Sequence, residues 1–136
     1  MNHGIVDQQQ LLDIEEALQQ ELIANGVSCA VLIDTAGNTI ADRNDGKKEY
    51  DIYAFAALAA GNYATVDSMA KLIGEDDFAQ IYHKGEKMSI HFSRMDDEML
   101  LIAIFGNDLA LGYLRLQVEE MRQKLRQICK MENKKS

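Results

Sequence analysis

Residues 26–41 read GVSCAVLIDTAGNTIA, and this stretch predicts the first hairpin of a β-sheet. Its first half, Val27 to Ile33, is an apolar run that favours a strand. The segment Asp34 to Asn38 supplies turn-forming residues, and a second β-favouring run continues to Ala41. We therefore expect Val27–Ile33 and Asn38–Ala41 to pair as antiparallel neighbours.

Helical patterns flank this hairpin. Apolar side chains recur every three or four residues ahead of it, at Leu11, Ile14, Leu18 and Leu22. Asn25-Gly26 then tolerates the left-handed backbone with which helices often end. The segment from Tyr50 to Ile73 is rich in alanine and has no proline, so it predicts a long central helix. The face of this helix expected to meet the core holds Ile52, Phe55, Ala59, Tyr63, Val66, Ala70 and Ile73.

A second hairpin is predicted from Phe78–Lys84 and Lys87–Ser93, which flank Gly85-Glu86. A two-residue connection that begins with glycine is typical of a type II′ turn, in which Lys84 would pair with Lys87. With this register the expected core face holds Ala79, Ile81, His83, Met88, Ile90 and Phe92. The other face holds Gln80, Tyr82, Ser89 and His91, so the two strand histidines point to opposite sides and share no metal.

The unbroken apolar run Met99–Phe105 predicts a middle strand that is covered on both faces. Asn107 or Asp108 is then placed to cap a final helix whose buried stripe holds Leu111, Leu114, Val118, Met121, Leu125 and Ile128. The element order is therefore helix, two strands, helix, three strands, helix. This order predicts one domain of 136 residues with an α/β fold of the α+β type, in which three helices sandwich a five-stranded antiparallel sheet.

Two motifs in this order resemble the Roadblock family of dynein light-chain-type proteins. Residues 26–41 are similar to the family's opening hairpin, a "GV-x-x-A" strand that ends in "D-x-x-G-x-x-I-A". Leu109–Arg115 resembles the family's "N-L-G-L-x-R" start to its last helix, with Ala110 where asparagine is usual. The resemblance covers about residues 8 to 130. It implies a profilin-like sheet in the order 2-1-5-4-3, with the first and last helices on one face and the central helix on the other.

The resemblance also implies a homodimer in which the third strand pairs with its twin while the central helices pack side by side. Two sequence features agree with such a dimer. One face of the central helix has residues with little charge where solvent exposure would favour Lys and Glu, and it holds Tyr53, Ala57, Ala60 and Ala64. The edge strand would bring Phe78, Gln80 and Tyr82 to the same interface. The alternative is that this helix face rests on the protein's own loops.

Composition argues against several classes of ligand. The net charge is −8, which is opposite to what a nucleic-acid-binding protein needs. The longest uncharged stretch, Ile52–Val66, is interrupted by Gly61 and Asn62, so we expect no membrane span. The first residues lack the pattern of a secretory signal, and Cys29 and Cys129 have no CxxC partner, so a reducing, cytoplasmic location is expected.

No motif indicates an enzyme. Gly46-Lys47-Lys48 lacks the earlier glycine and the following Ser or Thr of a phosphate-binding loop. The three histidines are too far apart in the expected fold to build a catalytic triad or a metal site. Glu75–Asp77 and Asp96–Glu98 lie in predicted turns, where acidic residues are usually solvated. We therefore expect no catalytic residues, no metal and no cofactor.

By resemblance, the predicted function is a non-enzymatic regulator or scaffold of a Ras-like small GTPase. A possible contact region lies beside the paired central helices, near Asp67, Ser68 and Lys71. Two alternatives remain. The chain could be a structural adaptor or light chain of a motor or signalling complex, or it could be a small-molecule sensor of profilin-like fold, which a deep internal pocket would favour.

Overall fold

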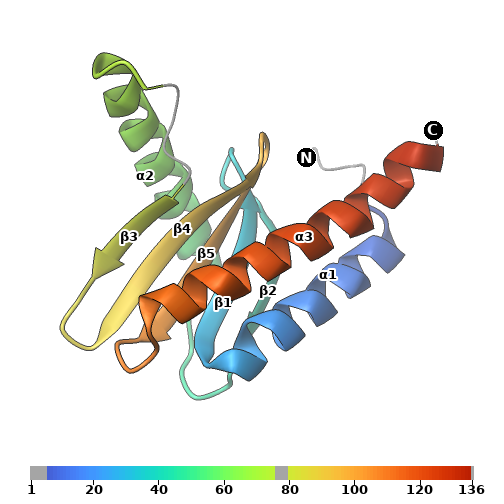
Figure 1. The fold of residues 1–136 in the computed structure, drawn as a ribbon, viewed down its shortest axis with the longest axis horizontal. Helices are drawn as coiled ribbons and strands as arrows, with labels where there is room; N and C mark the ends of the chain where they lie inside the picture. The colour runs from blue at the N-terminus through green and yellow to red at the C-terminus, as the bar shows by residue number, and fades with distance from the viewer. Residues whose placement is uncertain (1–5, 76–79, 136) are drawn as a thin grey trace.

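The computed structural model describes the backbone of residues 6–75 and 80–135 and the surroundings of side chains as far as Cys129. Five antiparallel strands form one sheet in the order β2-β1-β5-β4-β3 (Figure 1). The helices are α1 (Gln8–Glu21), α2 (Ile52–Leu72) and α3 (Leu111–Lys135), with a short 3-10 turn at Ile23–Asn25. The strands are β1 (Val27–Asp34), β2 (Thr39–Asn44), β3 (Gln80–Lys84), β4 (Met88–Asp96) and β5 (Met99–Gly106). The predicted fold class and strand order are confirmed.

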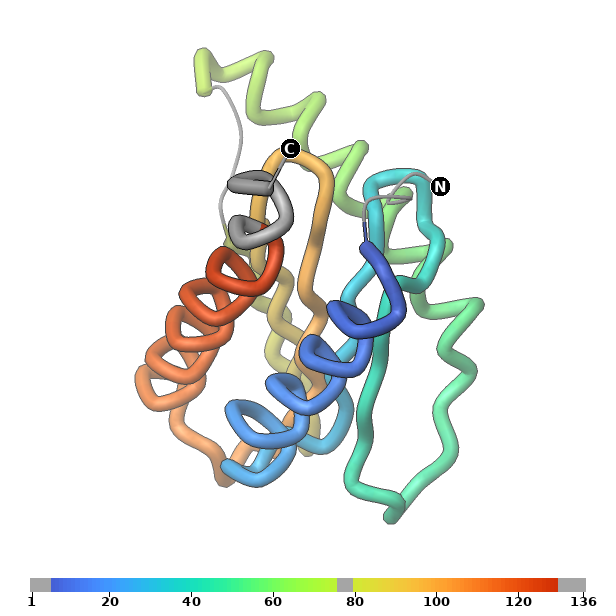
Figure 2. The backbone as a smooth tube through the Cα atoms, turned by 90° about the vertical axis from the view of Figure 1, so that its right-hand side faces the viewer, coloured from blue at the N-terminus to red at the C-terminus, as the bar shows by residue number. Residues whose placement is uncertain are grey.

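The helices divide unequally between the two faces of the sheet. Helices α1 and α3 lie side by side on one face, while α2 lies on the other (Figures 1 and 2). Each face has its own hydrophobic core, and β5 contributes to both because every residue from Met99 to Phe105 is buried. This burial on both faces explains the unbroken apolar run of the middle strand.

The turn of the first hairpin is held by the Asp34 carboxylate. Its Oδ1 accepts hydrogen bonds from the backbone N–H groups of Ala36 (3.0 Å) and Asn38 (2.8 Å). Its Oδ2 accepts a hydrogen bond from the Asn38 side chain at 3.0 Å. Gly37 has a φ of +95° and lies against α2, where an added Cβ would be 3.4 Å from both Ala57 Cα and Ala60 Cβ. The Asp34–Asn38 turn is therefore stabilised by its own side chains, and it packs against α2 through Gly37.

The predicted turn of the second hairpin is wrong. Lys84 pairs with Ser89, and the Gly85 N–H donates to the Met88 carbonyl at 2.9 Å, so Glu86-Lys87 forms the connection. Gly85 is also not among the glycines with positive φ, as a type II′ turn would require. The partner of each residue moves by two positions, so the predicted alternation of side chains between faces is unchanged.

Asn107 accounts for this turn. Its side-chain Nδ2 donates to the Gly85 carbonyl at 2.8 Å, and its backbone N–H donates to the Lys87 carbonyl at 3.0 Å. These two hydrogen bonds come from the β5–α3 connection. They determine the conformation of the hairpin turn and outweigh the local preference of Gly85 for a type II′ turn. Because α3 begins only at Leu111, Asn107 and Asp108 do not cap it, which corrects that expectation.

The expected core face of the second hairpin is confirmed only in part, because Phe92, Ile81, Met88 and Ile90 do pack in the core beneath α2, but the opposite face is buried as well. Ser89, His91 and Ser93, on the face assigned to polar residues, are each only 1% exposed because α3 lies over β4. On the opposite face Phe92 is buried, Ile81, Met88 and Ile90 are half-buried and His83 is exposed, while Ala79 lies outside the described residues. Helix α2 contacts β1 and β2 instead, so it leaves this part of the sheet open.

Candidate functional site

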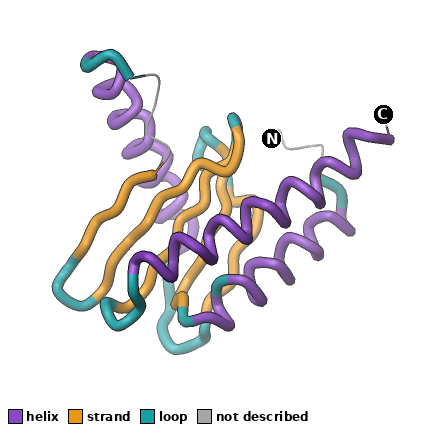
Figure 3. The backbone as a smooth tube through the Cα atoms, viewed as in Figure 1, coloured by secondary structure: helices purple, strands orange, loops and turns teal. Residues whose placement is uncertain are grey.

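Helix α2 and its C-terminal cap carry most of the large apolar side chains that are exposed among the described residues. Its buried residues are Ala56, Ala59, Ala60 and Ala70, and the first three pack in the core against the sheet. Its C-terminal half extends beyond the ends of the neighbouring strands (Figures 1 and 3). Its large exposed apolar side chains are Tyr53 (82% exposed), Leu58 (75%), Met69 (52%), Leu72 (86%) and Ile73 (71%). The expectation that Ile73 meets the core is therefore wrong, because the helix has left the sheet before it reaches this residue.

The face of α2 predicted to form a dimer contact is divided. Tyr53, Ala57 and Ala64 are exposed, but Ala60 is buried against Gly37 of the first hairpin. Part of this face therefore rests on the protein's own turn, as the alternative interpretation anticipated. The low charge of the face alone could not distinguish the two environments.

Strand β3 is an edge strand whose only neighbour among the described strands is β4. Tyr82 stacks on Phe105 with 6.2 Å between ring centroids, so its side chain lies on the face of the sheet that α3 covers. Gln80 is exposed and, two positions earlier in the strand, shares this orientation. Phe78 lies outside the described residues. Tyr82 and the α2 alanines therefore lie on opposite faces of the sheet. A single partner would contact both of them only across the backbone edge of β3.

An apolar groove of about 800 Å³ lies between α2 and the half-open face of β3 and β4. Apolar side chains make up most of its lining, including Phe55, Leu58, Met88, Ile90, Phe92 and Ile104. Polar residues at its rim include Lys48, Asp51, Asn62 and His83. Residue patterns did not predict this groove, because it exists only where α2 diverges from the sheet.

The polar side chains of the predicted contact region on α2 already interact with one another or with the helix backbone. Lys71 Nζ forms an ion pair with Asp67 Oδ2 at 3.1 Å, and Ser68 Oγ donates to the Ala64 carbonyl at 3.1 Å. Ser68 and Lys71 are exposed and Asp67 is half-buried. The helix thus presents a mixed polar surface next to its apolar stripe, with no strained or unpaired charge.

Two buried titratable groups of the sheet have shifted pKa values. His91 Nδ1 contacts Ser93 Oγ at 3.0 Å, and burial, with Arg115 and Arg122 nearby, lowers the pKa of His91 to about 4. Burial, followed by the charges of Asp42 and Asp45, raises the pKa of the Cys29 thiol to about 11. A thiol with a raised pKa is a weak nucleophile at neutral pH.

His83 lies on the other side of the sheet from His91, as predicted, with its ring edge-on to Phe92 at 5.8 Å between centroids. Within the described residues, no three His, Cys, Asp or Glu side chains gather closely enough to hold a metal ion. No helix in this part of the chain is long and apolar enough to cross a membrane.

Comparison with known proteins assigns a family to this arrangement. The model of the Roadblock/LC7 domain family matches residues 14–105. No curated protein matches the sequence. The structure of Myxococcus xanthus MglB is 28% identical over 93% of this chain and 94% of that one, with a TM-score of 0.82. A structure described as MglB with tetrameric arrangement is 26% identical over 95% and 93% of the two chains, with a TM-score of 0.77.

The fold is also profilin-like. Profilin IA of Acanthamoeba castellanii is 17% identical over 82% of this chain and 94% of its own, with a TM-score of 0.59. At this identity the likeness concerns the fold alone. It agrees with a sheet enclosed by helices on both faces, as the sequence predicted.

Proposed function

Because this chain belongs to the Roadblock/LC7 domain family, we propose that it forms a homodimer that regulates or scaffolds a Ras-like small GTPase and has no active site of its own. The observation that carries this proposal is the apolar surface of α2 beside β3, the edge strand, whose outer edge pairs with no strand that the structure describes. An exposed surface of this kind marks an interaction site in a water-soluble domain. An open strand edge likewise needs a partner or protection.

The geometry favours a symmetric dimer. Leu58 lines the groove, and Met69 and Leu72 lie on the same side of α2 at helical spacing, so the three form an apolar stripe. In a two-fold arrangement the same patch meets itself, so the protruding end of each α2 would reach the groove of the other copy. Pairing of the two β3 edges would join both sheets into one. The proposed interface keeps Tyr53, Ala57, Ala64 and the β3 edge, and adds Leu58, Met69, Leu72 and Ile73.

The small GTPase comes from the family resemblance. In the proposed mechanism the partner supplies the nucleotide and Mg²⁺, and the dimer binds one arrangement of the partner's switch loops more tightly than the other. The region of Asp67, Ser68 and Lys71 stays accessible beside the proposed dimer stripe and is the proposed contact. A cytoplasmic location follows from this partner and agrees with two cysteines that form no disulfide.

Pull-downs with the small GTPases of the host, loaded with GDP or with a GTP analogue, test this function. We expect binding that depends on the nucleotide, followed by a changed rate of hydrolysis if the protein is a regulator. Lys71→Glu should reverse one charge at the proposed contact and weaken the binding, whereas Lys124→Glu on α3 should not. Binding that ignores the nucleotide would leave only the adaptor function, and absence of binding to every GTPase would reject the proposal.

A further inference from the structure

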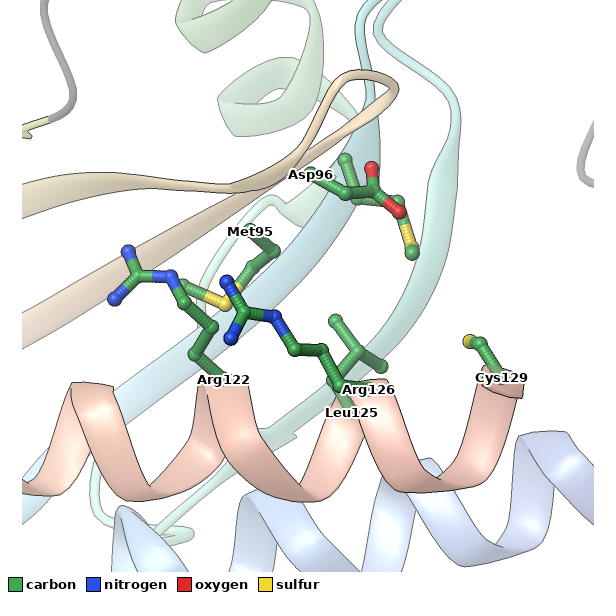
Figure 4. Close-up of a pocket in the computed structure, with 7 residues that line it drawn as sticks. Met95, Asp96, Arg122, Leu125, Arg126 and Cys129 are labelled. Carbon is green, nitrogen blue, oxygen red and sulfur yellow. The ribbon is translucent and has the colours of Figure 1, made fainter. Parts of the chain in front are cut away.

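A second cavity lies on the opposite face of the sheet, between α3 and the end of the β4–β5 hairpin (Figure 4). Its volume is about 260 Å³, just below the roughly 300–1,000 Å³ of pockets for drug-sized ligands. Three buried apolar side chains, Met95, Met99 and Leu125, form part of its wall. None of its lining residues lines the groove beside α2, so this cavity is separate from the proposed dimer and GTPase surfaces.

The helix side of the cavity is cationic. Arg122 and Arg126 are one turn apart in α3, and both extend from the helix towards the hairpin (Figure 4). The Arg122 guanidinium is already engaged, because Nη2 donates to the Arg94 carbonyl at 2.9 Å and Nη1 contacts Glu119. Arg126 forms no hydrogen bond or ion pair with any other residue that the structure describes. Its planar group is therefore available to bind a carboxylate through two hydrogen bonds.

The hairpin side of the cavity is anionic. Asp96 lies across the cavity from the two arginines (Figure 4). Its Oδ1 accepts a hydrogen bond from the Glu98 N–H at 2.8 Å, which fixes the carboxylate in the turn. The Asp96 charge also raises the pKa of Cys129, after the larger effect of burial, as expected for groups that share the cavity. Asp96 forms no ion pair with Arg122 or Arg126, so opposite charges are held apart across one small space.

We propose that this cavity binds a small zwitterion with an apolar side chain, the chemistry of a free α-amino acid such as leucine. The ligand carboxylate would pair with Arg126 and its ammonium group with Asp96. Its side chain would contact Met95, Met99 and Leu125, and the flexible methionines adapt readily to such a group. Each chemical feature of the ligand therefore has one counterpart in the cavity.

Isothermal titration with three compounds tests the proposal. L-leucine has both charges, 4-methylpentanoate lacks the ammonium group, and 3-methylbutylamine lacks the carboxylate. We expect saturable binding of leucine and about tenfold weaker binding of the other two, because each lacks one charge-assisted hydrogen-bonding group. No saturable leucine binding up to about 10 mM, or equal binding of all three compounds, would overturn the proposal.

Two variants assign the charges. Arg126→Gln should weaken leucine binding about tenfold, through the loss of a charge-assisted contact. Asp96→Asn keeps Oδ1 as the acceptor for Glu98 but removes the anion, so leucine and 4-methylpentanoate should then bind equally. Lys124→Gln is the matched control, because Lys124 is on the same helix but pairs with Glu21 of α1 at 2.8 Å. If Arg126→Gln binds leucine like the native protein, or if the control loses as much affinity, the assignment is wrong.

Discussion

At the scale of single residues, His91 should make the stability of the fold depend on pH. The folded protein keeps this buried imidazole neutral down to a pKa of about 4, whereas in the unfolded chain it takes up a proton near its ordinary pKa of 6.5. Its contribution to stability is therefore complete above pH 6.5 and is lost as the pH falls towards 4. Between pH 7 and pH 5 the loss should be about 2 kcal/mol, because one pKa unit corresponds to ~1.4 kcal/mol.

Urea unfolding of His91→Gln at both pH values checks this dependence. The variant should lose less free energy of unfolding between pH 7 and pH 5 than the native protein does. His83→Gln is the control, because His83 is exposed and its replacement should leave the native pH dependence in place. Identical pH dependence in the native protein and His91→Gln would show that burial of His91 is not responsible.

Asp34 offers a second prediction at the residue scale. Asp34→Ala removes the acceptor of three hydrogen bonds in the first turn and should lower the free energy of unfolding by about 2 kcal/mol. Asp34→Asn retains one acceptor oxygen and should cost roughly half as much. Asp45→Ala is the control, because Asp45 accepts a similar bond from the Lys47 N–H at 3.0 Å in an exposed loop. Chemical denaturation measures all three, and equal losses for Asp34→Ala and Asp45→Ala would contradict the special role of the first turn.

At the scale of the elements, predictability depends on whether an element carries its own packing pattern. Two buried segments could be predicted, the strand Met99–Phe105 and the stripe of α3 that includes Leu114 and Met121. The spacing of apolar residues along the chain indicates which of them are buried. The tip of the second hairpin could not be predicted, since Asn107 fixes it from a distant part of the chain. Local preference for a turn is weak compared with such a tertiary contact.

The α2 helix shows the same limit for the candidate site. Its existence and bounds could be read from the sequence within two residues, but its environment could not. Alanine serves equally well at a buried contact, such as Ala60 against Gly37, and on an exposed face, such as Ala64. Whether an apolar residue of α2 faces the core, the groove or solvent depends on the angle at which the helix leaves the sheet. The cavity beside Arg126 was likewise unpredictable, because residues of β4, β5 and α3 together line it.

At the scale of the whole molecule, the two faces of the sheet have different degrees of closure. Helices α1 and α3 cover most of one face, where even Ser89 and Ser93 are buried. The single helix α2 leaves a groove of about 800 Å³ on the other face and carries exposed apolar side chains beyond it. A fold that closes one face and leaves the other open is suited to burial of the open face by a second copy. In the proposed dimer, the second copy would cover apolar surface that a single chain leaves exposed.

This asymmetry predicts which substitutions separate the two copies. Leu72→Glu combined with Ile73→Glu places two charges on the exposed apolar surface at the C-terminal end of α2, and should halve the mass measured by light scattering at micromolar concentration. Both residues are exposed in one chain, so the double variant should stay folded, which circular dichroism verifies. Leu116→Glu is the matched control, because Leu116 is a similarly exposed leucine on α3, and its mass should remain that of a dimer. A native protein that is already a monomer would refute the dimer. Equal dissociation by both variants would show that the interface includes the α3 side and is not confined to the open face of the sheet.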